Sequence, residues 1–272
     1  MVTFASIVST ALTFYLLIAR AELDVSGALH LLGWWPVHPT DTAVCVLLTW
    51  MLYLGPHFEK IVVEKQLQGF REKTVESLYS WQGYRTYIAA PITEEVIFRS
   101  VLVPIHLLAK VSPGKIVFLT PLYFGIAHIH HAYEFKLTRP DVPFFPVLIR
   151  SLFQFGYTTI FGWYASFLYL RTGSLYGCIL VHTFCNLYGL PRFWGRVERE
   201  EHYVRNPVIL RGKDDVDAVA PHGEGGKLEL GWTVAYYVLL VTGVYAFYVW
   251  MWPLTRSDHG LAAFARDKNT LR

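Results

Sequence analysis

The chain has 272 residues, of which 53% are hydrophobic, 16% aromatic and only 17% charged, and its mean hydropathy is +0.33. Soluble domains carry about 25% charged residues, so this composition excludes disordered, collagen-like and coiled-coil chains and disfavours a water-soluble globule. A net charge of +3 without clustered basic residues is too small to indicate a nucleic-acid partner. The three cysteines neither suit a secreted disulfide framework nor show zinc-finger spacing. The sequence is therefore that of a membrane protein.

Apolar stretches long enough to cross a bilayer recur along the whole chain. A span needs about 20 mostly apolar residues. The first stretch ends in Ala19-Arg20-Ala21, which imitates a signal-peptide cleavage site, but it lacks a basic amino-terminal region and exceeds the usual apolar core. The sequence predicts an all-α polytopic transmembrane helix bundle. We expect about seven spans, in residues 2–19, 42–58, 86–109, 116–133, 151–170, 172–191 and 231–255.

The connections give the expected domain organisation. Residues 1–255 are expected to form a single transmembrane domain, followed by a polar C-terminal tail at 256–272. Segment 59–85 alternates charged and apolar residues, which favours an amphipathic helix at the membrane interface. Segment 192–229 is rich in charge and glycine, so we expect a solvated, partly disordered loop. Lys and Arg are more numerous in the loops on the side of the amino end, and this bias predicts that side to be cytosolic.

One predicted span carries three charged residues, Glu94, Glu95 and Arg99. Charged groups at bilayer depth are costly unless they pair or face a wet cavity, so each is a candidate for function. Glu95 and Arg99 are four residues apart with the acid first, the favourable order for an ion pair on a helix. Glu94 is rotated by about 100° from Glu95 and is therefore expected to be available for chemistry. A purely structural cluster of all three residues is the alternative.

Two further spans carry polar side chains at helical spacing. Phe124 and His128 share one helix face, as do His182 and Asn186. A single histidine in an apolar helix is usually a hydrogen-bonded core residue. Here three spans place polar groups toward the same membrane face, the one that the Lys and Arg count makes cytosolic. We expect them to share one polar cavity open to the cytosol.

These residue types suit the hydrolysis of an amide without a covalent intermediate. A carboxylate and an imidazole can deprotonate a bound water, and a second imidazole with an amide N–H can stabilise an oxyanion. Neither a Gly-x-Ser-x-Gly nor a His-Glu-x-x-His motif occurs. Cys185 is an alternative nucleophile one turn from His182, although nothing in the sequence would activate its thiol. A zinc site of one Glu and two His is a second alternative. We expect no metal and no cofactor.

Three motifs carry a resemblance to a known family: Glu94-Glu95-x-x-x-Arg99, Phe124-x-x-x-His128 and His182-x-x-x-Asn186. Together and in this order they resemble the type II CAAX prenyl endopeptidases, the Ras-converting enzymes, and their flanking residues look like the eukaryotic branch. The wider group includes abortive-infection and bacteriocin-immunity membrane proteases. Members usually have eight spans, and relative to them the remaining span would lie ahead of Val2.

The resemblance implies a catalytic set and a supporting set. Glu94 and His128 would activate the water, and His182 and Asn186 would form the oxyanion site. The supporting residues would be Glu95, Arg99 and Phe124.

The resemblance also implies substrates and a location. The substrates would be farnesylated or geranylgeranylated CAAX proteins, such as Ras-like small GTPases, and the product a C-terminal tripeptide. The location would be the endoplasmic reticulum membrane, with several passes through the lipid. This is physically reasonable, because an isoprenoid partitions into lipid and carries the peptide to membrane depth.

Two other classes of function remain as alternatives. A non-catalytic membrane protein would use the same polar cluster to bind prenylated or peptide ligands. A proton-coupled transporter would use buried Glu and His as a proton relay. Unrepeated spans without a pair of broken helices argue against the transporter.

Overall fold

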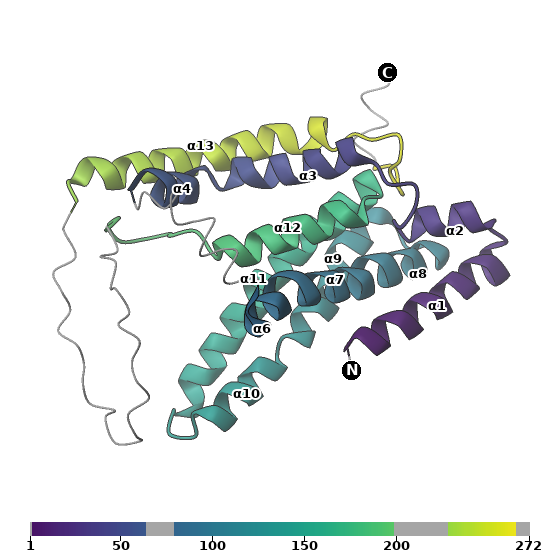
Figure 1. The fold of residues 1–272 in the computed structure, drawn as a ribbon, viewed down its shortest axis with the longest axis horizontal. Coiled ribbons are helices and arrows are strands. Elements are labelled where there is room, and N and C mark those ends of the chain that lie inside the picture. Colours follow the sequence, from purple (N-terminus) through teal and green to yellow (C-terminus); the bar gives the residue numbers. More distant parts are fainter. Residues whose placement is uncertain (1, 64–78, 199–227, 265–272) are drawn as a thin grey trace.

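All regular elements that the structure, a computed structural model, describes are helices (Figure 1). It describes residues 2–63, 79–198 and 228–264. The α-helices are α1 Val2–Ala21, α2 Val25–Leu31, α3 Pro39–Leu52, α4 Leu54–His57, α6 Trp81–Tyr84, α7 Ala90–Glu95, α8 Leu102–Leu108, α9 Pro113–Ala127, α10 His130–Thr138, α11 Phe144–Thr172, α12 Leu175–Tyr188 and α13 Leu230–Leu254. Three segments are π-helical: η1 Phe58–Val63, η2 Arg85–Ala89 and η3 Val96–Val101.

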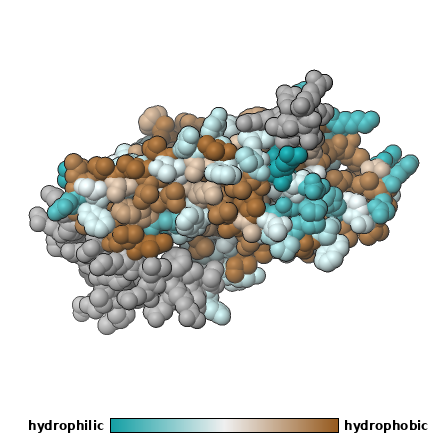
Figure 2. Space-filling model, turned by 90° about the horizontal axis from the view of Figure 1, so that it is seen from above, coloured by the Kyte–Doolittle hydropathy of each residue, from teal (hydrophilic) through white to brown (hydrophobic). Residues whose placement is uncertain are grey.

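The predicted all-α architecture is confirmed for the described residues, and each predicted span overlaps at least one helix. The span predicted at 86–109 is an unbroken succession of η2, α7, η3 and α8. Among the described residues, α1 and α13 are the helices both long and apolar enough to cross a membrane by length and composition. Their outward faces carry large apolar side chains, for example Phe4 and Val241, which are 73% and 67% exposed. Figure 2 likewise shows hydrophobic residues spread over much of one face of the molecule.

The span predicted at 116–133 was wrong at its carboxyl end. Helix α9 ends at Ala127, and the separate helix α10 begins at His130. The physical reason lies in His128, whose ring Nδ1 donates to the Phe124 carbonyl at 2.7 Å. The His128 backbone N–H bonds instead to the Gly125 carbonyl at 3.1 Å. This three-residue bond tightens and ends the helix, so His128 sits at the end of α9.

The predicted connections are described only in part. Residues 192–198 carry no helix, and residues 199–227 of the predicted loop lie outside the described residues. Of the predicted interfacial segment, η1, α6 and the start of η2 are described and residues 64–78 are not. The first part of the predicted tail packs on the bundle, because the Leu261 N–H donates to the Leu170 carbonyl at 2.8 Å. Residues 265–272 lie outside the described residues.

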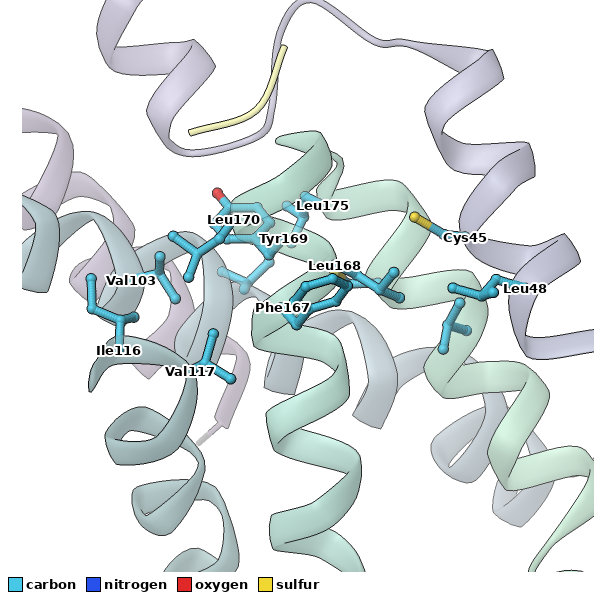
Figure 3. Packing of buried hydrophobic residues seen from close by; sticks show 13 residues of the cluster. Cys45, Leu48, Val103, Ile116, Val117, Phe167, Leu168, Tyr169, Leu170 and Leu175 are labelled. Atoms are coloured by element: carbon cyan, nitrogen blue, oxygen red, sulfur yellow. The ribbon is translucent and has the colours of Figure 1, made fainter. Parts of the chain in front are cut away.

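The core lies where α3, α8, α9, α11 and α12 meet. Helix α11 packs along α9, and α3 contacts both α12 and α13. The first of these contacts is close because Gly162 has no side chain: a Cβ there would lie 2.6 Å from Cβ of Pro121. Figure 3 shows the buried side chains between these helices, including Val103, Ile116 and Leu168, each at most 1% exposed. Inside a bilayer these side chains stabilise the bundle mainly through close van der Waals packing, because lipid tails are as apolar as the side chains themselves.

Candidate active site

The predicted ion pair between Glu95 and Arg99 is present and buried. Arg99 Nη1 donates to Glu95 Oε1 at 3.2 Å, and Arg99 Nε lies 3.1 Å from Oε2. The second contact is an ion pair without hydrogen-bond geometry. The two side chains are 0% and 1% exposed, so each charge depends on the other for compensation.

Glu95 also holds a histidine from a distant part of the chain. His182 Nδ1 lies 2.7 Å from Glu95 Oε1, and its side chain is 8% exposed. A carboxylate accepts, so Nδ1 carries the proton and the ring is fixed with Nε2 turned the other way. The carboxylate therefore both neutralises Arg99 and orients His182.

Glu94 lies between two imidazoles. Its Oε2 is 4.0 Å from His128 Nε2 and 3.8 Å from His182 Nε2. Both separations exceed a direct hydrogen bond, but two hydrogen bonds of about 2.8 Å at the tetrahedral angle of water span about 4.6 Å. The Glu94 side chain is 27% exposed, whereas its neighbour Glu95 is fully buried. The predicted pair of Glu95 with Arg99 is therefore present, and the availability of Glu94 for chemistry stays a prediction.

The hydrogen bonds also set the tautomer of His128. Its Nδ1 donates to the Phe124 carbonyl, so Nε2 of the neutral ring accepts. Nε2 faces the Glu94 carboxylate, which is also an acceptor. Two facing acceptors are stabilised by a group that donates to both, as a water does. This arrangement suits the binding and orientation of a water molecule.

Aromatic rings enclose the charged groups. The Arg99 guanidinium lies over the Phe124 ring at 5.0 Å and over the Phe161 ring at 5.6 Å. The Phe124 ring packs edge-on against His128 at 4.5 Å, and the Phe161 ring lies 4.8 Å from His182. Phe161 was missed from the sequence because it is one of many aromatics in α11. No local spacing distinguishes it.

A proline explains why α12 docks where it does. Pro91 has no N–H, so the Tyr87 carbonyl loses its α-helical donor and the Thr86 carbonyl loses its π-helical donor. Two side chains of α12 replace them. Thr183 Oγ1 donates to the Tyr87 carbonyl at 2.9 Å, and Asn186 Nδ2 donates to the Thr86 carbonyl at 3.0 Å. These bonds place α12, and His182 with it, against the helix that carries Glu94.

Asn186 and Cys185 are the two further candidates from the sequence. One N–H of the Asn186 amide is committed to Thr86, which leaves the second as a donor. Cys185 packs against the hydrophobic core. On exposed α10, the hydrogen bond from His131 at 2.9 Å holds the pKa of Glu134 below its usual value, so Glu134 is a charged surface carboxylate.

Comparison with known proteins places these motifs in a described family. The family model "Type II CAAX prenyl endopeptidase Rce1-like" matches residues 76–188, which include Glu94, His128 and His182. "Probable CAAX prenyl protease 2" of Schizosaccharomyces pombe is 39% identical over 176 residues, covering 64% of this chain and 65% of the relative. "CAAX prenyl protease 2" of Homo sapiens is 35% identical over 171 residues, covering 60% and 50%.

A third relative extends the aligned region. "CAAX prenyl protease 2" of Saccharomyces cerevisiae is 32% identical over 214 residues, covering 75% of this chain and 62% of the relative. The chain thus spans half to just under two thirds of the length of these curated relatives. No solved structure matches.

Proposed function

Since the chain belongs to the type II CAAX prenyl endopeptidase family, we propose that it is a membrane endopeptidase that releases the last three residues of prenylated CAAX proteins. The observation that carries this proposal is the position of Glu94. A partly exposed carboxylate faces two imidazoles at 3.8 and 4.0 Å, beside a second carboxylate that is fully buried and paired. A protein that only bound its ligand would have no need of a base so oriented.

Glu94 and His128 are proposed to activate the water. The water donates one hydrogen to the Glu94 carboxylate and the other to His128 Nε2, which the Phe124 carbonyl keeps in its accepting tautomer. As the water oxygen attacks the carbonyl carbon after the prenylated cysteine, Glu94 takes its proton. When the C–N bond breaks, Glu94 returns that proton to the leaving amine. The products are a prenylated C-terminal cysteine and a tripeptide.

His182 and Asn186 are proposed to stabilise the oxyanion. The 2.7 Å contact between His182 Nδ1 and the Glu95 carboxylate holds the ring so that Nε2 faces the reacting group beside Glu94. The second N–H of the Asn186 amide is the other donor. Two such donors are worth several kcal/mol in the transition state when water is excluded. Glu95, Arg99 and Phe124 support them, and the reaction requires no metal or cofactor.

The membrane setting is proposed from the family and from the exposed apolar side chains of α1 and α13. We propose about seven spans in one transmembrane domain, residues 1–255, in the endoplasmic reticulum membrane, with the polar site open to the cytosol. Partners would be farnesylated or geranylgeranylated CAAX proteins such as Ras-like small GTPases, together with membrane lipid. Outward apolar faces on α1 and α13 support contact with lipid.

The test is tripeptide release from a defined substrate. Purified full chain in nanodiscs is incubated with a farnesylated CAAX peptide and, separately, with the same peptide lacking the isoprenoid. We expect one tripeptide per cleaved farnesylated peptide and little from the unprenylated one. Saturable binding of the farnesylated peptide without cleavage would instead assign the cluster to a binding protein.

A further inference from the structure

A second group of histidines lies where α2, α3 and the segment after α13 meet. His38 is the residue before α3, Asp41 lies in the first turn of α3, and His259 follows α13. Candidate ligand atoms of these three side chains all lie within 4.8 Å of one another, and all three side chains are half-buried. His30, at the end of α2, is close enough for its charge to interact with those of His38 and His259.

This group is separate from the site around Glu94. The group lies against Gly173, just ahead of α12, because a Cβ at Gly173 would lie 2.6 Å from the His259 carbonyl oxygen and 3.5 Å from the His30 ring. His182 lies seven residues beyond the first residue of α12, which is about 10 Å along a helix that rises 1.5 Å per residue. The proposed hydrolysis uses none of the three residues.

The hydrogen bonds within the group leave one polar atom without a partner. Asp41 Oδ2 accepts from Ser257 Oγ at 2.8 Å and lies 3.0 Å from His259 Nδ1. His38 Nε2 is buried and has no hydrogen-bond partner among the described residues. An unsatisfied buried nitrogen costs about 1–3 kcal/mol, and a metal ion is one group that would satisfy it.

The two imidazoles lie face to face. The His38 and His259 rings stack with centroids 3.3 Å apart and planes inclined by 11°. Histidine binds metals through a ring nitrogen of the neutral imidazole. A metal ion lies in the plane of each imidazole that binds it, so binding one ion requires the two rings to rotate out of this stack. Bonds of about 2.1 Å at the tetrahedral angle require ligand atoms about 3.4 Å apart.

We propose that His38, Asp41 and His259 bind a zinc ion that fastens the segment after α13 to the beginning of α3. Two imidazoles and one carboxylate suit zinc better than calcium or magnesium, which prefer all-oxygen shells. Water or His30 completes the tetrahedron. The ion joins positions 218 residues apart, and its role is to stabilise the end of the bundle rather than to take part in hydrolysis.

Zinc binding to the purified full chain tests this directly. The chain is stripped with a chelator, then titrated with zinc alone. A second cluster on α10, His130, His131 and Glu134, is also close enough to hold an ion, so the titration is repeated in the His131→Ala, Glu134→Gln background. We expect one zinc per chain to remain in that background, and the affinity to fall at least 100-fold on adding His38→Ala and His259→Ala.

A spectroscopic variant keeps the test decisive if those substitutions unfold the chain. His259→Cys retains a metal ligand, so with cobalt in place of zinc it should add a thiolate-to-cobalt band in the near ultraviolet that the unsubstituted chain lacks. Failure of the stripped chain to bind stoichiometric zinc, binding undiminished by His38→Ala with His259→Ala, or a cobalt spectrum unchanged in His259→Cys would each overturn the proposal. Tripeptide release is measured separately, so failure of this site leaves the proposed hydrolysis untouched.

Discussion

Replacing Glu95 by glutamine should destabilise the protein far more than the same change at Glu94. Glu95→Gln removes the negative charge from a pair that is 0% and 1% exposed and leaves the Arg99 cation uncompensated. Breaking a buried pair in this way costs about 3–5 kcal/mol. The glutamine oxygen can still accept from Arg99 Nη1, and the Phe124 and Phe161 rings still face the guanidinium. We therefore expect the lower end, about 3 kcal/mol.

A loss of about 3 kcal/mol in the free energy of unfolding corresponds to a measurable fall in the melting temperature, Tm. At about 2–4 °C per kcal/mol for chains of comparable size, Tm should fall by about 6–12 °C. Glu94 makes no contact shorter than 3.8 Å with either imidazole and is 27% exposed, so Glu94→Gln should move Tm by no more than about 2–4 °C. The assay is thermal unfolding of both variants in one detergent, followed by tryptophan fluorescence. Equal melting temperatures for Glu95→Gln and the unsubstituted chain would refute the argument that Arg99 depends on this carboxylate.

Three further predictions concern Cys185, metal chelation and Thr183. Cys185→Ala should keep most of the tripeptide release, because the thiol packs in the core and lies outside the water-activating group; inactivation of a folded Cys185→Ala protein would revive the thiol nucleophile. Chelation should leave turnover intact at temperatures where the chain stays folded. If zinc occupies the site of His38, Asp41 and His259, chelation should also lower Tm. Activity that is lost on chelation and restored by one equivalent of zinc would make Glu94 a metal ligand. Thr183→Val should cost about 1–3 kcal/mol, because the Tyr87 carbonyl loses its donor at 2.9 Å; an unchanged Tm would contradict the role given to Pro91.

Local spacing predicted those features that depend on residues close in the sequence. The Glu95–Arg99 pair is four residues apart on one helix, and the apolar runs lie on the observed helices. The π-helical segments on either side of α7 were not predicted. Pro91 was a visible signal of a disrupted hydrogen-bond ladder, but where the freed carbonyls find donors depends on the tertiary position of α12.

The hydrogen bonds between side chains on different helices could not be predicted from spacing. The sequence placed His182 and Asn186 on one helix face but could not predict their hydrogen-bond partners, which are Glu95 for His182 and the Thr86 carbonyl for Asn186. These contacts join positions 87 and 100 residues apart. The end of α9 was likewise missed, because a histidine side chain competes with its own backbone for the carbonyl four residues earlier.

The role of Glu94 as the base is the central claim, and tripeptide release by Glu94→Gln tests it most directly. The matched control is Glu134→Gln, which removes a surface carboxylate that is 56% exposed on α10. Loss of a positioned general base costs about 10²- to 10⁴-fold in rate, so we expect that loss in Glu94→Gln with Tm nearly unchanged. Glu134→Gln should keep full turnover. Cleavage by folded Glu94→Gln at the unsubstituted rate would contradict the account and remove Glu94 from the chemistry.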